Sequence, residues 1–149
     1  MIVLNEMNLN FKARSVNESF ARSAVSAFVM ELDPTISEIS DIKTAVSEAV
    51  TNCIVHGYSQ KDGNVYINVR IKDNAKVIIR IRDTGCGIKD VEKAMEPLYT
   101  TGGADRAGLG FTVMQSFMDK VTVRSKEGKG TVVTMEKSII PRGVNDRAR

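Results

Sequence analysis

Helical periodicity between Ile36 and Cys53 constrains the fold of this chain more than any other feature of the sequence. Apolar residues recur there every three or four positions: Ile36, Ile39, Ile42, Val46, Ala49, Val50 and Cys53. This spacing aligns them in one stripe, so we expect a long helix with one buried face. The helix should run to about His56 and end at Gly57, because glycine readily terminates a helix.

The residues before this helix predict a strand and then a first helix. Residues 1–13 alternate in part, and three apolar side chains face the same way: Met7, Leu9 and Phe11. Ser15 and Glu18 have the spacing of a capping box, so a helix should begin beside them. Asp33 is expected to cap the long second helix, with Pro34 at its first helical position.

Four β-rich segments follow the long helix: residues 64–71, 75–81, 120–125 and 131–137. The two segments of each pair are separated by a short polar or glycine-containing turn, so each pair is expected to form a hairpin. Between the pairs, residues 83–110 are punctuated by glycine and include a short helical piece near 91–95. A third helix is predicted at about 109–118.

The predicted order of elements is β-α-α-β-β-α-β-β. Strands joined by short turns pair antiparallel, and the helices can cover one face of the resulting sheet. We therefore expect an α+β fold, a two-layer sandwich whose mixed, mostly antiparallel sheet is covered on one face by helices. The order lacks the strict alternation of a doubly wound nucleotide fold. A chain of this length suggests one domain, residues 1–140, followed by a disordered basic tail at 141–149.

Charge and cysteine content exclude several classes of function. A net charge of +3 is too small to indicate direct binding to nucleic acid or to a membrane surface. Two cysteines and one histidine do not suit a disulfide scaffold or a structural zinc site. No apolar run approaches the ~20 residues that span a bilayer, and the N-terminus does not resemble a signal peptide. We therefore expect a cytoplasmic protein.

Glu48 and Asn52 form the first element with chemical potential. They lie four residues apart on the predicted long helix, so both project from one face. A carboxylate can accept a proton from a hydroxyl, and an amide oxygen can ligate Mg²⁺. Taken alone, a solvated polar helix face explains this pair more simply.

The second element is Asp83 followed by Gly85 and Gly87, directly after an apolar strand. A carboxylate at the end of a strand can accept a hydrogen bond from the exocyclic amine of adenine. The glycines allow a sharp turn and a close approach of main chain to a ligand. An ordinary strand-to-helix turn explains the same residues equally well.

Two further glycine-rich elements follow. The first runs from Thr101 through Gly108 and Gly110 into the third helix, whose N-terminal amides can hold phosphate. The second is the turn before Thr131, which lacks the spacing of a Walker loop and is best explained as a hairpin turn. The Thr131 hydroxyl can still contact a base.

In this order and spacing, the four elements resemble the four boxes of the GHKL ATPase superfamily, which includes gyrase, MutL and the histidine kinases. The resemblance implies their sandwich fold, with ATP held between helices and a lid. Six segments are more specifically similar to the anti-sigma F factors of spore-forming bacteria: residues 17–22, 32–35, 42–52, 56–58, 97–101 and 117–119. This similarity extends from about Asn5 to Lys137.

The resemblance to anti-sigma F factors implies a dimeric, ATP-dependent serine-protein kinase. Such proteins hold a sporulation sigma factor inactive while ATP is bound. They also phosphorylate a serine of an anti-anti-sigma protein that otherwise displaces the sigma factor, converting Mg-ATP to ADP.

Roles for individual residues follow from the same resemblance. It implies that Glu48 is the general base for the incoming serine, that Asn52 ligates Mg²⁺, and that Asp83 reads adenine. Gly85, Gly87 and Thr131 would surround the base, and Thr101, Gly108 and Gly110 would lie near the phosphates. Arg106 would stabilise the transferring phosphoryl group or dock a partner, and Arg22 would face the protein partners.

The lid departs from the family pattern. Residues 100–106 read Thr-Thr-Gly-Gly-Ala-Asp-Arg, one residue shorter than usual and without a Lys-Pro pair. We expect a more flexible lid as a result. Cys86 receives no role. His56 lies four residues beyond Asn52 on the same helical face and could touch phosphate, but a structural histidine at the helix end explains it more simply.

Three other functions are compatible with parts of the sequence. One is an ATP-gated sigma-factor binding protein with little catalysis, although such a switch has no need of a base at Glu48. Another is an anti-sigma kinase of a stress-response sigma factor, against which residues 17–22 argue. The third is the catalytic fragment of a histidine kinase, which is a poor match because the sole histidine, His56, lies within the long helix.

Overall fold

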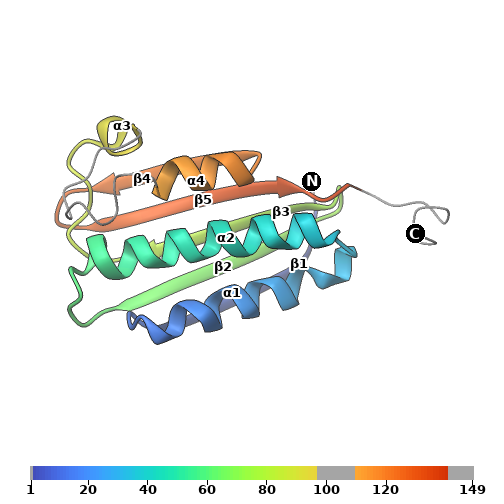
Figure 1. Cartoon of the computed structure of the whole chain (residues 1–149), viewed down its shortest axis with the longest axis horizontal. Coiled ribbons are helices and arrows are strands. Elements are labelled where there is room, and N and C mark those ends of the chain that lie inside the picture. The colour runs from blue at the N-terminus through green and yellow to red at the C-terminus, as the bar shows by residue number, and fades with distance from the viewer. Residues whose placement is uncertain (1, 97–109, 141–149) are drawn as a thin grey trace.

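A five-stranded sheet with helices on one face forms the protein (Figure 1). The computed structural model describes residues 2–96 and 110–140. The strands are β1 (Val3–Lys12), β2 (Asn64–Lys72), β3 (Lys76–Asp83), β4 (Lys120–Lys126) and β5 (Gly130–Ser138). The helices are α1 (Val16–Val29), α2 (Ile36–Asn52), α3 (Val91–Ala94) and α4 (Gly110–Phe117), with a 3₁₀ turn at Met30–Leu32 and a π turn at Cys53–Gly57. The predicted α+β sandwich is confirmed.

The strand order across the sheet is β1-β2-β3-β5-β4, and all four neighbouring pairs are antiparallel. Both predicted hairpins are present, since β2 pairs with β3 and β4 with β5. The strand β5 lies between β3 and β4. The C-terminal hairpin, β4 and β5, therefore joins the strands β1 to β3 through the pairing of β5 with β3. This pairing sets Asp83, at the end of β3, opposite Thr131, at the start of β5.

The core lies between the sheet and the helices. Alternate residues of β2 and β3 are buried: Val65, Ile67, Val69, Ile71, Val77, Ile79 and Ile81. The predicted stripe of α2 meets them through Ile42, Val46 and Val50, which have no exposed surface. Each such side chain contributes roughly 1.5–3 kcal/mol on burial. Ile36 is the exception, because it lies at the first turn of α2 and is exposed.

The first helix begins after Ser15 as predicted, but no capping box forms there; the predicted cap at Asp33 is wrong, and Pro34 precedes the second helix instead of occupying its first position. Ser15 has helical backbone angles and its side chain caps nothing. Asp33 has a left-handed conformation (φ 51°) and ends the 3₁₀ turn. Thr35 is the cap of α2, since its hydroxyl accepts the Glu38 amide and the Glu38 carboxylate accepts the Thr35 amide. The left-handed residue reverses the chain just before α2, which moves the cap two residues along.

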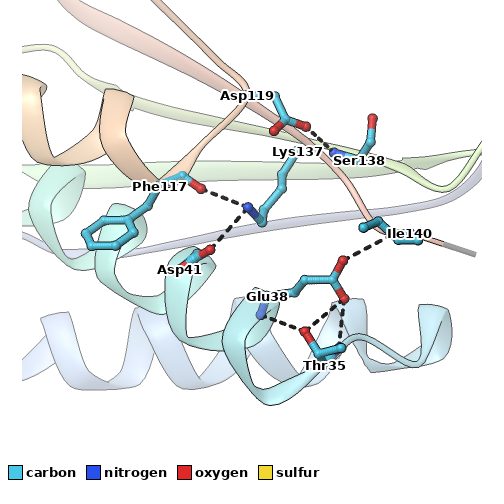
Figure 2. Close-up of polar contacts among 8 residues, drawn as sticks. All are labelled: Thr35, Glu38, Asp41, Phe117, Asp119, Lys137, Ser138 and Ile140. Carbon is cyan, nitrogen blue, oxygen red and sulfur yellow. Dashed lines mark hydrogen bonds and ion pairs between the residues drawn. The ribbon is translucent and has the colours of Figure 1, made fainter.

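Polar contacts fix the end of β5 to the helix layer (Figure 2). Glu38 accepts the Thr35 amide through Oε1 at 2.8 Å and the Ile140 amide through Oε2 at 3.1 Å. Lys137 Nζ lies 3.3 Å from Asp41 Oδ2 and donates to the Phe117 carbonyl at 2.9 Å. One lysine therefore joins the last turn of α4 to α2, and these two helices border the site described below.

Helical winding continues past α2 to Gly57, as the sequence predicts, but the last five residues form a π turn. The Tyr58 amide donates to the Cys53 carbonyl, five residues earlier, at 2.9 Å, and this spacing is that of a π turn. Such turns are rare and often occur at functional sites.

In the described part of the chain, no helix has both the length and the apolar character needed to cross a bilayer. Residues 141–149, the predicted tail, lie outside the described residues.

Candidate functional site

A cavity of about 1030 Å³ opens at the C-terminal end of α2. Its wall comes from α2 and the π turn, the glycine turn after β3, α3, the start of α4 and the β4–β5 turn. Five of the predicted site residues line it: Asn52, Asp83, Gly87, Gly110 and Thr131. The volume is at the upper end of the roughly 300–1,000 Å³ typical of small-molecule sites.

Asp83 provides a buried carboxylate in this cavity. Its side chain is held by donors, with the Gly85 amide 2.9 Å from Oδ1 and further hydrogen bonds from the Thr131 amide and the Cys53 thiol. Burial raises the pKa of Asp83 above its usual value, and the hydrogen bonds from Gly85, Cys53 and Thr131 act in the opposite direction. Asp83 is only 4% exposed, so its carboxylate can offer an acceptor to a ligand from a fixed position.

Cys53 is a residue of the site that sequence reasoning counted only as part of the apolar stripe. It lies in the cavity wall and is buried. Burial, then the neighbouring charge of Asp83, raises the pKa of the Cys53 thiol well above its usual value. The thiol therefore stays protonated and can donate its proton to the Asp83 carboxylate.

The end of the long helix touches the glycine turn directly. The Cys86 amide donates to the Gly57 carbonyl at 2.8 Å, and a Cβ on Gly85 would overlap that same carbonyl. Gly87 has a positive φ of 75°, and a Cβ there would overlap the Lys126 carbonyl. These two glycines allow the main chain of the glycine turn to contact the end of the π turn at Gly57 and the end of β4 at Lys126.

Tyr58 is a second residue that sequence reasoning left without a role. Its ring is buried, and its hydroxyl donates to the Asn64 carbonyl at 2.6 Å and accepts the Thr84 amide at 2.8 Å. These bonds fix the residue that follows Asp83. The helix end thus supports the strand end from two sides, through Gly57 and Tyr58.

Of the two site residues predicted on α2, one lines the cavity. Asn52 lines it, whereas Glu48, one turn earlier and half-buried, is not among its described lining residues. Arg22 lies elsewhere, on α1, where Nη1 is 2.9 Å from Glu18 Oε2 and 3.5 Å from Ser47 Oγ. His56 and Cys86 both line the cavity.

The lid positions lie outside the described residues. This applies to Thr101, Arg106 and Gly108, whereas Gly110 begins α4 and lines the cavity. Within residues 2–96 and 110–140, no cluster of three or more His, Cys, Asp or Glu side chains could hold a metal by itself. The side chains present suit a metal that arrives with phosphate ligands, because the Asn52 amide offers one hard oxygen donor at the wall.

Comparison with known proteins adds to this geometry. Residues 11–137 match the family described as the histidine kinase-like ATPase domain. The anti-sigma F factor of Thermoanaerobacter pseudethanolicus is 60% identical over 136 residues, which cover 91% of this chain and 94% of that protein. Those of Clostridium acetobutylicum and Geobacillus kaustophilus are 55% and 54% identical, and each alignment covers 93% of the relative and 89% and 91% of this chain, respectively.

Solved structures agree on the fold. The RsbU and RsbW domains of a Mycobacterium tuberculosis protein match with a TM-score of 0.67 at 18% identity, covering 91% of this chain and 32% of that one. The mycobacterial sensor histidine kinase MprB matches with a TM-score of 0.58 at 14% identity, covering 91% of this chain and all of the other. The matched domain is an ATPase domain, so nucleotide binding belongs to this fold. With more than half of its sequence shared over nine-tenths of each relative, the chain belongs to the anti-sigma F factor family.

Proposed function

We propose that this chain is an anti-sigma factor and ATP-dependent serine-protein kinase. It sequesters a sporulation sigma factor and phosphorylates a serine of its anti-anti-sigma antagonist. The observation that carries the proposal is the cavity that has the Asp83 carboxylate and the Asn52 amide in its wall. The names of the relatives, anti-sigma F factors, support the regulatory part.

ATP would enter this cavity with its base against Asp83. The exocyclic amine of adenine donates to the carboxylate, whose position the Gly85 amide holds. Thr131 lies beside Asp83, and the turn at Gly87 borders the base. The triphosphate would extend toward Gly110, the first residue of α4. The main-chain amides at a helix N-terminus can bind such an anion. Thr101 and Gly108 are assigned to the phosphates from the family resemblance alone.

Asn52 would hold Mg²⁺ together with phosphate oxygens of the nucleotide. A magnesium ion neutralises phosphate charge and orients the γ-phosphoryl group. One amide oxygen is a sufficient protein contribution, because Mg²⁺ keeps several water and phosphate ligands.

Glu48 would act as the general base, one helical turn from Asn52. The Glu48 carboxylate would take the proton of the incoming serine hydroxyl while the serine oxygen bonds to the γ-phosphorus. The bond from that phosphorus to the bridging oxygen breaks, and ADP leaves with the electron pair. Arg106 is assigned to the charge on the transferring group from the family resemblance.

Arg22 is proposed to contact the protein partners. Its side chain is 42% exposed, and its guanidinium forms an ion pair with Glu18, four residues earlier on α1. Exposed pairs of this kind contribute less than about 1 kcal/mol, so an acidic group of a partner can replace Glu18 at little cost. A homodimer is part of the same proposal.

A nucleotide-gated binding protein with little catalysis is the second candidate. The observation in its favour is that Glu48 is absent from the described cavity lining. In that case ATP changes partner affinity without phosphoryl transfer, by favouring one conformation.

The deciding experiment follows label from γ-labelled ATP to the matching anti-anti-sigma protein in the presence of Mg²⁺. Glu48→Gln and Asn52→Ala are assayed beside the wild type, and ATP binding is measured by titration calorimetry. Serine labelling that Glu48→Gln abolishes, with ATP affinity retained, supports the kinase. ATP binding without labelling by the wild type supports the nucleotide-gated binder. Transfer that persists in Glu48→Gln removes the role of Glu48 as a base.

A further inference from the structure

Three polar side chains form one row across the sheet, and two of them, Asp83 and Thr131, line the cavity. Thr131 is the Cα partner of Asp83 on β3 and of Ser125 on β4. Directly opposed residues of antiparallel strands project to the same face of a sheet. Thr131 is on the middle strand of the three and therefore lies between Asp83 and Ser125.

The hydroxyl of Ser125 makes three short contacts. It accepts the Ile88 amide at 2.7 Å, donates to the Gly130 carbonyl at 2.9 Å, and lies 2.8 Å from Thr131 Oγ1. A serine hydroxyl has one proton and two lone pairs. Its proton is directed to the Gly130 carbonyl, so in the contact with Thr131 the threonine is the donor.

This assignment determines what Thr131 offers to the cavity. Its single proton points back to Ser125, and its two lone pairs are acceptors. The Asp83 carboxylate beside it is an acceptor as well. A ligand edge at this position must therefore bring N–H donors, because two acceptors facing a third acceptor leave buried polar groups without a hydrogen.

We propose that Ser125 is a positioning residue that fixes Thr131 as an acceptor and thereby makes the cavity prefer a 6-amino purine to a 6-oxo purine. The proposal rests on the proposed nucleotide function. Adenine presents an amine with two N–H donors at the 6-position, whereas hypoxanthine presents a carbonyl oxygen there and has its one N–H on the neighbouring N1, so it cannot satisfy both acceptors at the 6-position. Without the Ser125 acceptor, the Thr131 hydroxyl is free to turn and donate to that oxygen, so discrimination falls.

The test compares ATP with ITP, which differ at the 6-position and in the proton that hypoxanthine carries on N1, by titration calorimetry on the full chain. The wild type should prefer ATP, and Ser125→Ala should lower the ratio of ATP to ITP affinity by about tenfold, the effect of one hydrogen bond. Ser125→Thr keeps the hydroxyl and suits a strand, so it should preserve the ratio within about twofold.

A structural role for Ser125 gives a different result. If Ser125 only held the turn together, Ser125→Ala would weaken both nucleotides equally and leave the ratio unchanged, which overturns the proposal. Thr131→Val provides an arm that does not depend on the folding of Ser125→Ala. It removes the acceptor itself, so an unchanged ratio in this variant also overturns the proposal.

A double-mutant cycle separates Ser125 from Thr131. Because Ser125 acts through Thr131, adding Ser125→Ala to Thr131→Val should leave the ratio where Thr131→Val alone puts it. A further fall contradicts the proposed route. A wild type that binds neither nucleotide overturns the proposed function together with this inference, whereas a wild type that binds ATP with a ratio insensitive to Ser125 overturns the inference alone.

Discussion

Gly57, the last residue of the π turn, lies directly against the carboxylate of Asp83. A Cβ placed on Gly57 would lie 2.8 Å from both Asp83 Cγ and Oδ2. The helix that carries Asn52 and the strand that carries Asp83 therefore have a fixed separation at the cavity, and only a residue without a side chain permits it.

Gly57→Ala should displace the Asp83 carboxylate. We expect a loss of about 1–3 kcal/mol in the free energy of unfolding from overpacking. ATP affinity should fall by at least about tenfold, because the acceptor for the base moves. Urea unfolding and titration calorimetry measure the two effects. Ser40→Ala, at an exposed position of α2, is the control and should change stability by less than about 0.5 kcal/mol. Normal ATP affinity in Gly57→Ala would show that the contact does not position Asp83.

Asp83→Asn should separate binding from stability. The new amide oxygen can accept from Gly85, Thr131 and Cys53, which turns the NH₂ group toward the cavity. There it opposes the amine of adenine, so ATP affinity should fall by about tenfold or more. The melting temperature without nucleotide should change little, because the donors around the side chain keep an acceptor. Retention of wild-type ATP affinity would contradict the assignment of Asp83 to the base.

The same variant tests the pH dependence of stability. Burial raises the pKa of Asp83 in the folded chain above its unfolded value. Such a group contributes stability that is fully present below the unfolded pKa and is lost as the pH rises through the folded pKa. The free energy of unfolding of the wild type, relative to Asp83→Asn, should therefore increase as the pH falls from about 7 toward 4. Urea unfolding at a series of pH values measures this slope, and the opposite sign would exclude a raised pKa.

Tyr58→Phe should destabilise the fold beneath the cavity. The substitution leaves the Thr84 amide and the Asn64 carbonyl without the hydroxyl that joins them. Thr84 is exposed and Asn64 half-buried, so we expect a loss of about 0.5–1.5 kcal/mol, the net contribution of a typical hydrogen bond. Tyr66→Phe is the matched control, because its ring contact with the Arg82 guanidinium, 4.1 Å from the ring centroid, survives the substitution. Equal loss of stability in the two variants, measured by urea unfolding, would argue against the Tyr58 bonds.

Lys137→Met should loosen α4 from α2. Lys137 joins Asp41 to the Phe117 carbonyl, and its side chain is only 12% exposed (Figure 2). Removing it leaves Asp41 without this cation, so we expect a loss of about 1–2 kcal/mol. Lys76→Met removes the more exposed pair with Glu136 and should cost less than about 1 kcal/mol. Melting temperatures of the two variants make the comparison, and a larger effect for Lys76→Met would be contrary to expectation.

Local pattern was sufficient to predict the helices and strands of this protein. The apolar stripe of α2 is long and regular, and the alternation in β2 and β3 gives one buried face each, so burial of these faces fixes the elements. The caps failed because Ser15 and Asp33 are chemically suitable but the chain path gives them helical and left-handed backbone angles. Cap chemistry is decided by backbone geometry that neighbouring elements impose.

The sequence by itself determined the layers of the fold and the residue types at the cavity, including Asn52, Asp83 and Thr131. Only the tertiary structure decided which of them meet. The pairing of β3 with β5 sets Asp83 beside Thr131, and the π turn brings Gly57 onto Asp83. The supporting roles of Cys53, Tyr58 and Ser125 have no sequence pattern, because each depends on hydrogen bonds to groups on other segments of the folded chain. Periodicity records which face of an element is buried, whereas a hydrogen bond needs a partner that only the completed sheet supplies.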